Sequence, residues 1–352
     1  MSQNQYKKQI IMKVNNSNNS LLPINLPCLK DYRQNLADQG LKLPLQTVPF
    51  DRNGLLQNLP SLSADKSGWP WNLETVIPLK PESDQSIYPK ISIVMPSYNQ
   101  AEYIEESIRS ILLQNYPNLE LIVFDGGSND GTKEVLEKYS PWLSFWQSEK
   151  DNGQGHAINL GFSIASGDYF GWINSDDFYL PNCLYKVAKN FLKTNKDFIY
   201  GDSLILNEND KSVRYDQSFF LLDRYLRFGG IIPSHSSFWK SSIHQPIWED
   251  LNCAIDAELW MRLVAKRSKS HIRYPLAIAR IQSEAKSVNE RYRELWKEDY
   301  EQKIWQAYKP AKMWKLRCYE FRYVQRIYKK FNMDLSNIEI NKLLKRNDFL
   351  FS

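Results

Sequence analysis

The first residues that could do chemistry form a short acidic run, Asn174-Ser-Asp-Asp177, that directly follows an apolar stretch. The length and the aromatic, β-branched content of 169–173 predict a buried strand, so the acids would lie where that strand leaves a sheet. Ligands of open α/β sheets bind at this end of the strands, and a carboxylate there can hold a divalent cation against a phosphate. The run therefore predicts a metal-assisted site for a nucleotide-linked substrate, with Asp176 as a ligand of Mg²⁺ or Mn²⁺. Taken alone, the run is more readily explained by solvated acids that cap the next helix.

Asp176 and Asp177 could also be the paired acid and base of a glycoside hydrolase. A retaining pair needs carboxyl groups ~5 Å apart across a sugar, and an inverting pair needs more. Neighbouring residues of an extended chain point to opposite sides. We therefore prefer the metal site.

Two glycine-containing turns suggest a nucleotide. Asp125-Gly-Gly follows a predicted strand, so its glycines permit close backbone approach, and Asp125 could accept hydrogen bonds from a ribose or base. A plain turn explains this segment equally well. In Gly153-Gln-Gly155 the third glycine of a dinucleotide-binding motif would fall at Ile158, so a nicotinamide enzyme is disfavoured.

Two further candidates lie nearer the C-terminus. Asp256 begins an amphipathic helix, where an acid stabilises the helix by about 0.5–1 kcal/mol, and spacing alone gives it no larger role. His235 could contact a phosphate or an acceptor, although a loop histidine with satisfied hydrogen bonds is the simpler interpretation.

The elements that must position these residues alternate between strand and helix from Lys90 onward. Such alternation predicts an α/β fold built from βαβ units around a largely parallel sheet. The expected strands are 91–95, 119–124, 144–147, 169–173 and 198–200, with a hairpin over 204–215; the expected helices are 101–114, 132–139, 182–194, 256–266 and one that starts after Gly155.

Composition limits the class of protein and its location. The 352 residues carry a net charge of +5, yet 309–330 holds eight basic residues against Glu320 alone, so the rest of the chain is slightly acidic. The four cysteines form no CxxC pair, which favours a reducing cytoplasm over a disulfide framework or a zinc site. No run approaches the ~18 apolar residues of a membrane span.

Five segments together resemble glycosyltransferase family two, which has the GT-A fold. They occur in the family's order and cover about residues 68–288: Met95-Pro-Ser-Tyr-Asn-Gln100, Asp125-Gly-Gly-Ser-Asn-Asp-Gly-Thr132, Ser148-Glu-Lys-Asp-Asn-Gly-Gln-Gly-His-Ala-Ile-Asn159, Trp172-Ile-Asn-Ser-Asp-Asp177 and Ile255-Asp-Ala-Glu-Leu-Trp-Met-Arg262. The resemblance implies a Rossmann-like, mixed and mainly parallel sheet flanked by helices. It also implies transfer of a sugar from a nucleotide diphosphate, with inversion at the anomeric carbon.

The resemblance also implies roles for individual residues. Asp256 matches the catalytic base and Asp176 the metal-binding carboxylate, with Gln282 as a second ligand of Mg²⁺ or Mn²⁺. The nucleotide-sugar positions are Pro96, Tyr98, Asp125, Asp151, Asn159, Asn174 and Ser175; the acceptor-side or supporting positions are His235, Trp260 and Arg262.

Three positions depart from the family pattern. Asn174 replaces the first acid of the DxD element, Gly126 stands where many relatives have a second acid, and Gln282 replaces a histidine ligand. A glutamine carbonyl binds Mn²⁺ less strongly than a histidine nitrogen, so weaker metal binding is expected.

We therefore expect an irregular, partly ordered lead-in over 1–88, a GT-A catalytic domain over 89–289 and a helical, basic and aromatic extension over 290–352. The expected protein is a cytoplasmic enzyme of surface polysaccharide or glycolipid assembly that acts on a glycan or lipid-linked acceptor and binds no nucleic acid. Residues 309–331 interleave basic and aromatic side chains, which suggests a peripheral membrane contact; a helix that packs on the catalytic domain is the favoured alternative. The alternative function is a catalytically weak relative that binds sugar nucleotides as an assembly partner.

Overall fold

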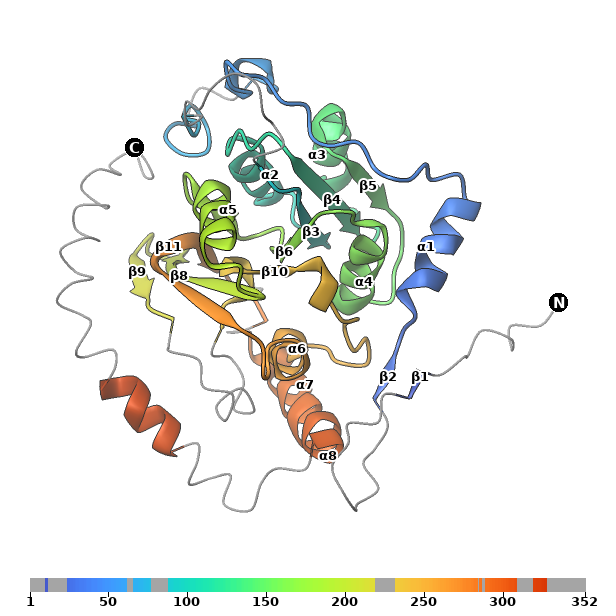
Figure 1. Ribbon diagram of the computed structural model, residues 1–352, viewed down its shortest axis with the longest axis vertical. Helices are drawn as coiled ribbons and strands as arrows, with labels where there is room; N and C mark the ends of the chain where they lie inside the picture. The colour runs from blue at the N-terminus through green and yellow to red at the C-terminus, as the bar shows by residue number, and fades with distance from the viewer. Residues whose placement is uncertain are drawn as a thin grey trace.

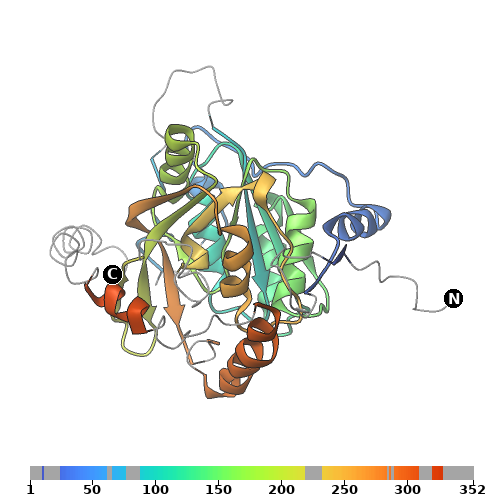
Figure 2. The same cartoon turned by 60° about the horizontal axis from the view of Figure 1, so that its bottom comes forward.

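A nine-stranded mixed sheet forms the centre of the molecule, with helices on both faces (Figures 1 and 2). The computed structural model describes residues 10–11, 24–61, 66–76, 88–218, 232–283, 285–286, 289–308 and 319–327. The strand order is β5-β4-β3-β6-β10-β8-β11-β7, and β9 pairs with β8 at the side. The strands are β3 (Ile91–Ser97), β4 (Leu119–Asp125), β5 (Phe145–Ser148), β6 (Tyr169–Trp172), β7 (Phe178–Tyr179), β8 (Phe198–Asn207), β9 (Val213–Asp216), β10 (Ser237–Lys240) and β11 (Lys269–Ile281).

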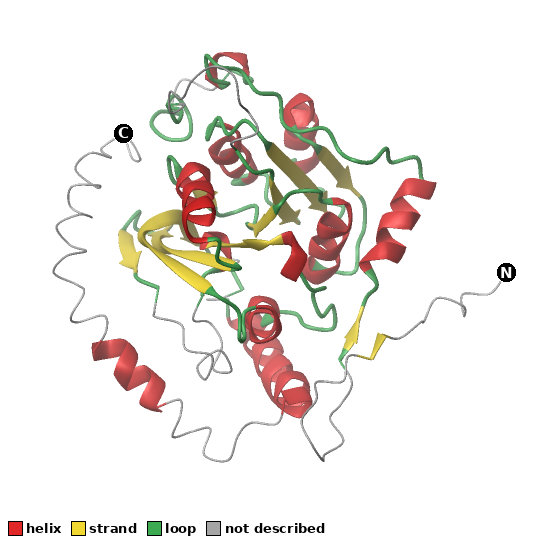
Figure 3. Cartoon of the chain, in the orientation of Figure 1, coloured by secondary structure: helices red, strands yellow, loops and turns green. Residues whose placement is uncertain are grey.

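One half of this sheet is parallel and the other is mixed. Strands β5, β4, β3 and β6 run parallel, whereas β10 pairs antiparallel with both β6 and β8. Strand β11 then returns parallel to β8 in the longest ladder of the described sheet. The expected α/β class, with a mixed and mainly parallel sheet, is confirmed (Figure 3).

The helices bury the two faces of the parallel half in separate cores. Every residue of β3 and β4 is buried, as expected of strands covered on both sides. Helices α2, α3 and α5 cover one face, while α4 and α6 cover the other. The helices are α1 (Leu29–Asp38), α2 (Ile104–Leu112), α3 (Thr132–Tyr139), α4 (Gln154–Ile164), α5 (Cys183–Thr194), α6 (Ile255–Leu263), α7 (Arg293–Glu298) and α8 (Trp305–Tyr308).

The lead-in contains a helix that the sequence did not predict. Residues 29–38 form α1, which packs along α4 and is fastened by the Arg33 guanidinium to the carbonyl of Ser163, 3.3 Å away. A short antiparallel pair, β1 (Ile10–Ile11) and β2 (Asn25–Leu26), precedes it. Farther along, Trp69 is buried and its indole N–H donates to the carbonyl of Tyr179 at 2.7 Å, so this part of the lead-in packs on the domain that follows.

The chain beyond Asn289 is helical wherever it is described. Helix α7 continues through a π-helical turn, Asp299–Ile304, into α8, and residues 319–327 form one more helix. Ile304 and Ala307 join the core on the α6 side, so this first part of the extension packs on the catalytic domain. Within the described residues, no helix combines the length and the apolar content needed to cross a membrane.

Candidate active site

A cavity of about 1020 Å³ opens beside the ends of β3 and β6. Its walls come from the loop after β3, the start of α4, the acidic turn after β6, the start of α6 and the segment 279–296. Eight of the predicted site residues contact it: Pro96, Tyr98, Asp151, Asn174, Ser175, Asp176, Asp256 and Gln282. The fold thus brings an acid of the β6 turn and an acid of α6 to one space, although 80 positions separate them in the chain.

The two adjacent acids of the turn have different surroundings. The Asp177 carboxylate accepts the backbone N–H of Arg280 at 3.0 Å and lies 3.7 Å from Nδ1 of His235. The Asp176 carboxylate accepts only a long hydrogen bond, 3.3 Å, from the Gln282 amide among the described residues. Burial raises the pKa of both carboxyl groups, and the charge of Asp176 raises that of Asp177 further. Asp177 is therefore bound within the protein, whereas Asp176 is left with capacity for a ligand.

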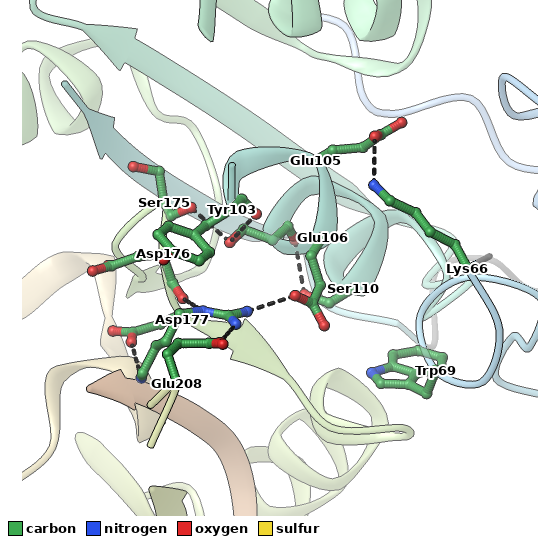
Figure 4. A network of polar contacts seen from close by, with 12 residues as sticks. Lys66, Trp69, Tyr103, Glu105, Glu106, Ser110, Ser175, Asp176, Asp177 and Glu208 are labelled. Carbon is green, nitrogen blue, oxygen red and sulfur yellow. Dashed lines mark hydrogen bonds and ion pairs between the residues drawn. The ribbon is translucent and has the colours of Figure 1, made fainter. Parts of the chain in front are cut away.

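Arg280 fixes this turn through Asp176, Glu106 and Glu208, three residues that are labelled in Figure 4. Its Nε donates to the carbonyl of Asp176 at 2.9 Å, and its guanidinium pairs with Glu106 of α2 and Glu208 after β8. The guanidinium also lies over the ring of Tyr103, 4.6 Å from the centroid. The sequence did not predict this role for Arg280; an arginine two positions before the candidate ligand Gln282 is the signal that could have pointed to it.

Asp256 lies in the first turn of α6 and faces the cavity. Its Oδ1 accepts the N–H of Ala257 at 2.7 Å, and no other described group hydrogen-bonds its carboxylate. Burial raises its pKa to about 6. A carboxylate with this pKa is ionised at neutral pH and is a stronger base than an exposed aspartate.

Three buried groups hold α6 in place. Asp299 accepts the backbone N–H groups of residues 252, 253 and 254 through one carboxylate oxygen, at 2.7–3.1 Å, just before the helix starts. Arg262 pairs with Glu258 at 2.6 Å and donates to the carbonyl of Pro246. Trp260 packs edge-on against Phe198 and Trp239. Arg262 and Trp260 therefore lie behind Asp256 and outside the cavity lining.

One part of the cavity is lined by Pro96, Tyr98 and Asp151. The Tyr98 ring is 62% exposed, which leaves one face open to a planar ligand. Asp151 accepts the N–H of Gly153 at 2.8 Å, and burial raises its pKa. A Cβ at Gly126 would lie 3.1 Å from the Asp151 carboxylate, so a larger residue at this position would require Asp151 to shift slightly.

Three more predicted residues, besides Trp260 and Arg262, lie outside the cavity lining. The Asp125 carboxylate is buried and accepts from the N–H of Ser128 and the hydroxyl of Ser148, and the residue lines a smaller pocket of about 220 Å³ next door. Asn159 is fully buried and exchanges two hydrogen bonds with the backbone of Ile247. His235 is buried beside Asp177, and burial lowers its pKa to about 4, so it is neutral at pH 7.

The donor set suits a Mg²⁺ ion that binds together with phosphates. Asp176 offers one carboxylate and Gln282 one amide, while the Asn174 carbonyl already accepts from Gln154 at 2.8 Å and Trp172 at 3.0 Å. The described residues contain no cluster of three His, Cys, Asp or Glu side chains that could hold an ion alone. Mg²⁺ commonly takes one or two carboxylates and completes its shell with water and substrate phosphates.

The sequence missed several cavity residues that come after β11. Lys286, Arg291, Tyr292 and Trp296 all contact the cavity. Lys286 lies in the irregular stretch after β11, and the other three lie in the helical segment that follows, so only the presence of a basic residue shortly after Gln282 could have drawn attention to this wall.

Comparison with known proteins identifies the family. Residues 92–247 match the family model described as Glycosyl transferase family 2. An uncharacterised glycosyltransferase of Rickettsia prowazekii is 30% identical over 231 residues, which cover 60% of this chain and 72% of that protein. The Escherichia coli UDP-Glc:alpha-D-GlcNAc-diphosphoundecaprenol beta-1,3-glucosyltransferase WfgD is 38% identical over 120 residues, covering 34% of this chain and 47% of that protein.

Other similarities are more partial. The chain spans 20–23% of the length of three other rickettsial glycosyltransferases that it resembles. Among solved structures, S. aureus TarS in complex with UDP-GlcNAc is 20% identical with a TM-score of 0.47, over 58% of this chain and 64% of that one. On the family match and the rickettsial relative, the chain belongs to glycosyltransferase family 2.

Proposed function

We propose that the protein transfers a sugar from a nucleotide-diphosphate donor to an acceptor hydroxyl with inversion at the anomeric carbon. The observation that carries this proposal is that Asp176 and Asp256 face one cavity, and that among the described side chains only the Gln282 amide, at 3.3 Å from Asp176, hydrogen-bonds either carboxylate. Asp176 is suited to the diphosphate side of the reaction, and Asp256 is suited to the acceptor side.

In this mechanism Asp256 acts as the general base. Its carboxylate takes the proton of the acceptor hydroxyl as the oxygen attacks the anomeric carbon. The new carbon–oxygen bond forms on the face opposite the breaking bond to the diphosphate, so one displacement inverts the configuration. Its raised pKa supports this role, because a carboxylate with a pKa of about 6 holds a proton better than an ordinary aspartate while being ionised at pH 7.

The other cavity residues bind the donor. Asp176 and Gln282 would hold Mg²⁺, which when bound neutralises charge on the diphosphate. Tyr98 and Pro96 offer surfaces for the base, and Asp151 offers a carboxylate to base or ribose donors. Asn174 and Ser175 contact the cavity beside Asp176, where the sugar and phosphates would meet.

We further propose an acceptor of the polysaccharide or lipid-linked class. The Escherichia coli relative is named for a diphosphoundecaprenol-linked acceptor, and its match supports this class for the present chain.

A catalytically weak relative that only binds sugar nucleotides is the second candidate. The single carboxylate of the metal site, with Asn174 and Gln282 in place of stronger ligands, favours it. The uncommitted Asp256 favours the enzyme.

The experiment is a panel of nucleotide sugars, each incubated with acceptor glycans and Mg²⁺ or Mn²⁺, scored for released nucleoside diphosphate and for the anomeric configuration of the product. We expect one donor to give an inverted glycoside. Tight donor binding without product would instead favour the binding protein, and a retained configuration would contradict the mechanism.

A further inference from the structure

Lys286 lines the cavity, and no acid among the described residues forms an ion pair with its ammonium group. Its ammonium donates to the Gln154 side-chain carbonyl at 2.9 Å and to the backbone carbonyl of Asn252 at 2.7 Å. Both acceptors are neutral. In the described part of the chain, no carboxylate lies within ion-pair distance of this ammonium.

The ammonium is nevertheless within electrostatic reach of the two acids of the site. Lys286 contributes to lowering the pKa of Asp176 and of Asp256, although burial outweighs it at both. All three residues contact the same cavity. The lysine therefore lies where the reacting groups of the donor and the acceptor would meet.

Burying a cation without an anionic partner is unfavourable, and burial lowers the pKa of Lys286 accordingly. The Arg280 guanidinium, which contacts the same cavity, differs because Glu106 and Glu208 neutralise it. An ammonium has three donors, and two of those of Lys286 are used within the protein. The third donor and the uncompensated charge are available to an anion in the cavity.

We infer that Lys286 binds the diphosphate of the donor and stabilises it as it departs. This inference rests on the proposed function. A nucleoside diphosphate carries more negative charge than one divalent cation beside one carboxylate can neutralise, so a second cation at this point favours departure. When the bond to the anomeric carbon breaks, the electron pair stays on the diphosphate oxygen, and the ammonium stabilises the resulting charge.

The contacts of Lys286 also explain how it is held. Gln154, at the start of α4, accepts from Lys286 and donates to Asn174, so one amide joins the lysine to the acidic turn. The indole N–H of Trp296 donates to the carbonyl of Lys286 at 3.0 Å. A purely structural lysine at this position would stabilise the fold without preferring diphosphates, and this difference can be measured.

The test is calorimetric titration of the full chain with UDP, UMP, GDP and GMP, in excess EDTA and again with Mg²⁺. The variants are Lys286→Gln, Lys286→Arg and the control Lys189→Gln, which removes an exposed lysine on α5. We expect Lys286→Gln to weaken diphosphate binding about tenfold or more in EDTA while monophosphate binding changes less than about threefold. Lys286→Arg should retain most of the affinity, and the control should match the parent.

The other outcomes overturn the inference, and they show whether the proposed function fails with it. Equal losses for diphosphate and monophosphate in Lys286→Gln, or no loss at all, would assign Lys286 a structural role while leaving the proposed function intact. A failure of the parent to bind any of the four nucleotides, with thermal unfolding confirming a folded protein, would instead remove the proposed function. If Lys286→Gln does not fold, Lys286→Arg decides alone, because a charge-based role predicts near-parent diphosphate affinity and a large loss contradicts it.

Discussion

The hydrogen-bond partners of each buried carboxylate determine whether it can bind a ligand. Asp177 is bound to β11 by the N–H of Arg280, whereas Asp176, its neighbour in the chain, keeps only a 3.3 Å contact with Gln282. The sequence predicted only that the two side chains point apart, as neighbouring residues of an extended chain do. It could not predict the role of Arg280, whose partners Glu106 and Glu208 come from distant segments.

The raised pKa of Asp256 predicts the pH dependence of the reaction. A carboxyl with a folded-state pKa of about 6 becomes protonated as the pH falls through 6, and it then cannot accept the acceptor's proton. We expect kcat/KM to fall about tenfold per pH unit below about 6. Initial rates from pH 5 to 8 at fixed Mg²⁺ would measure this limb, and a flat profile down to pH 5 would exclude Asp256 as the titrating base.

The raised pKa of Asp256 also affects the stability of the folded protein. The pKa of Asp256 in the folded protein lies above the ordinary aspartate value, so the folded state favours the protonated carboxyl. The free energy of unfolding therefore decreases as the pH rises to about 6, and it stays lower above that pH. Asp256→Asn removes that decrease, so its unfolding temperature at pH 8 should equal or exceed that of the parent.

At the scale of elements, α6 brings Asp256, the proposed base, to the cavity. The C-terminal segment after residue 289 holds α6 in place. The sequence predicted α6, α2 and the β8–β9 hairpin, with bounds that differ by a few residues. It missed α1, β7, β10 and the whole of β11. Strand β11 escaped prediction because its first half, 269–274, is polar and only partly buried, and register shifts interrupt it around Pro275.

Asp299 is the residue through which the extension positions α6. Asp299→Asn removes the charge that accepts three backbone N–H groups ahead of the helix, so we expect a loss of about 2 kcal/mol in the free energy of unfolding. Urea denaturation would measure it, with Asp38→Asn on the exposed end of α1 as the control. A variant as stable as the parent would show that α6 is held by its apolar contacts instead.

At the scale of the whole molecule, the family-matched core is framed by segments outside it. Helix α1 lies along α4 on one side, and α7 and α8 pack near α6 on another (Figure 1). The sequence indicated the order of these parts but not their contacts, because each contact joins residues far apart in the chain. The domain boundaries predicted at residues 88 and 289 remain predictions. Most of the segment 309–331, for which a membrane contact is predicted, lies outside the described residues.

The predicted membrane contact can be tested by substitutions in the helix 319–327. Its Tyr319 and Tyr323 side chains are 70% and 67% exposed, beside the exposed Arg322 and Arg326. If the helix lies on an anionic membrane, replacing both tyrosines by serine should reduce co-sedimentation with phosphatidylglycerol vesicles several-fold. The control is Leu192→Ser, which removes an exposed apolar side chain from α5. Equal sedimentation of both variants and the parent would contradict the contact.

The central claim is that Asp256 is the base of a sugar transfer in this cavity, and the most direct measurement is the turnover of Asp256→Asn with the donor that the panel identifies. We predict that released diphosphate falls by at least about a hundredfold while calorimetric affinity for the nucleoside diphosphate stays within about threefold of the parent. Turnover at the parent's rate would contradict the account.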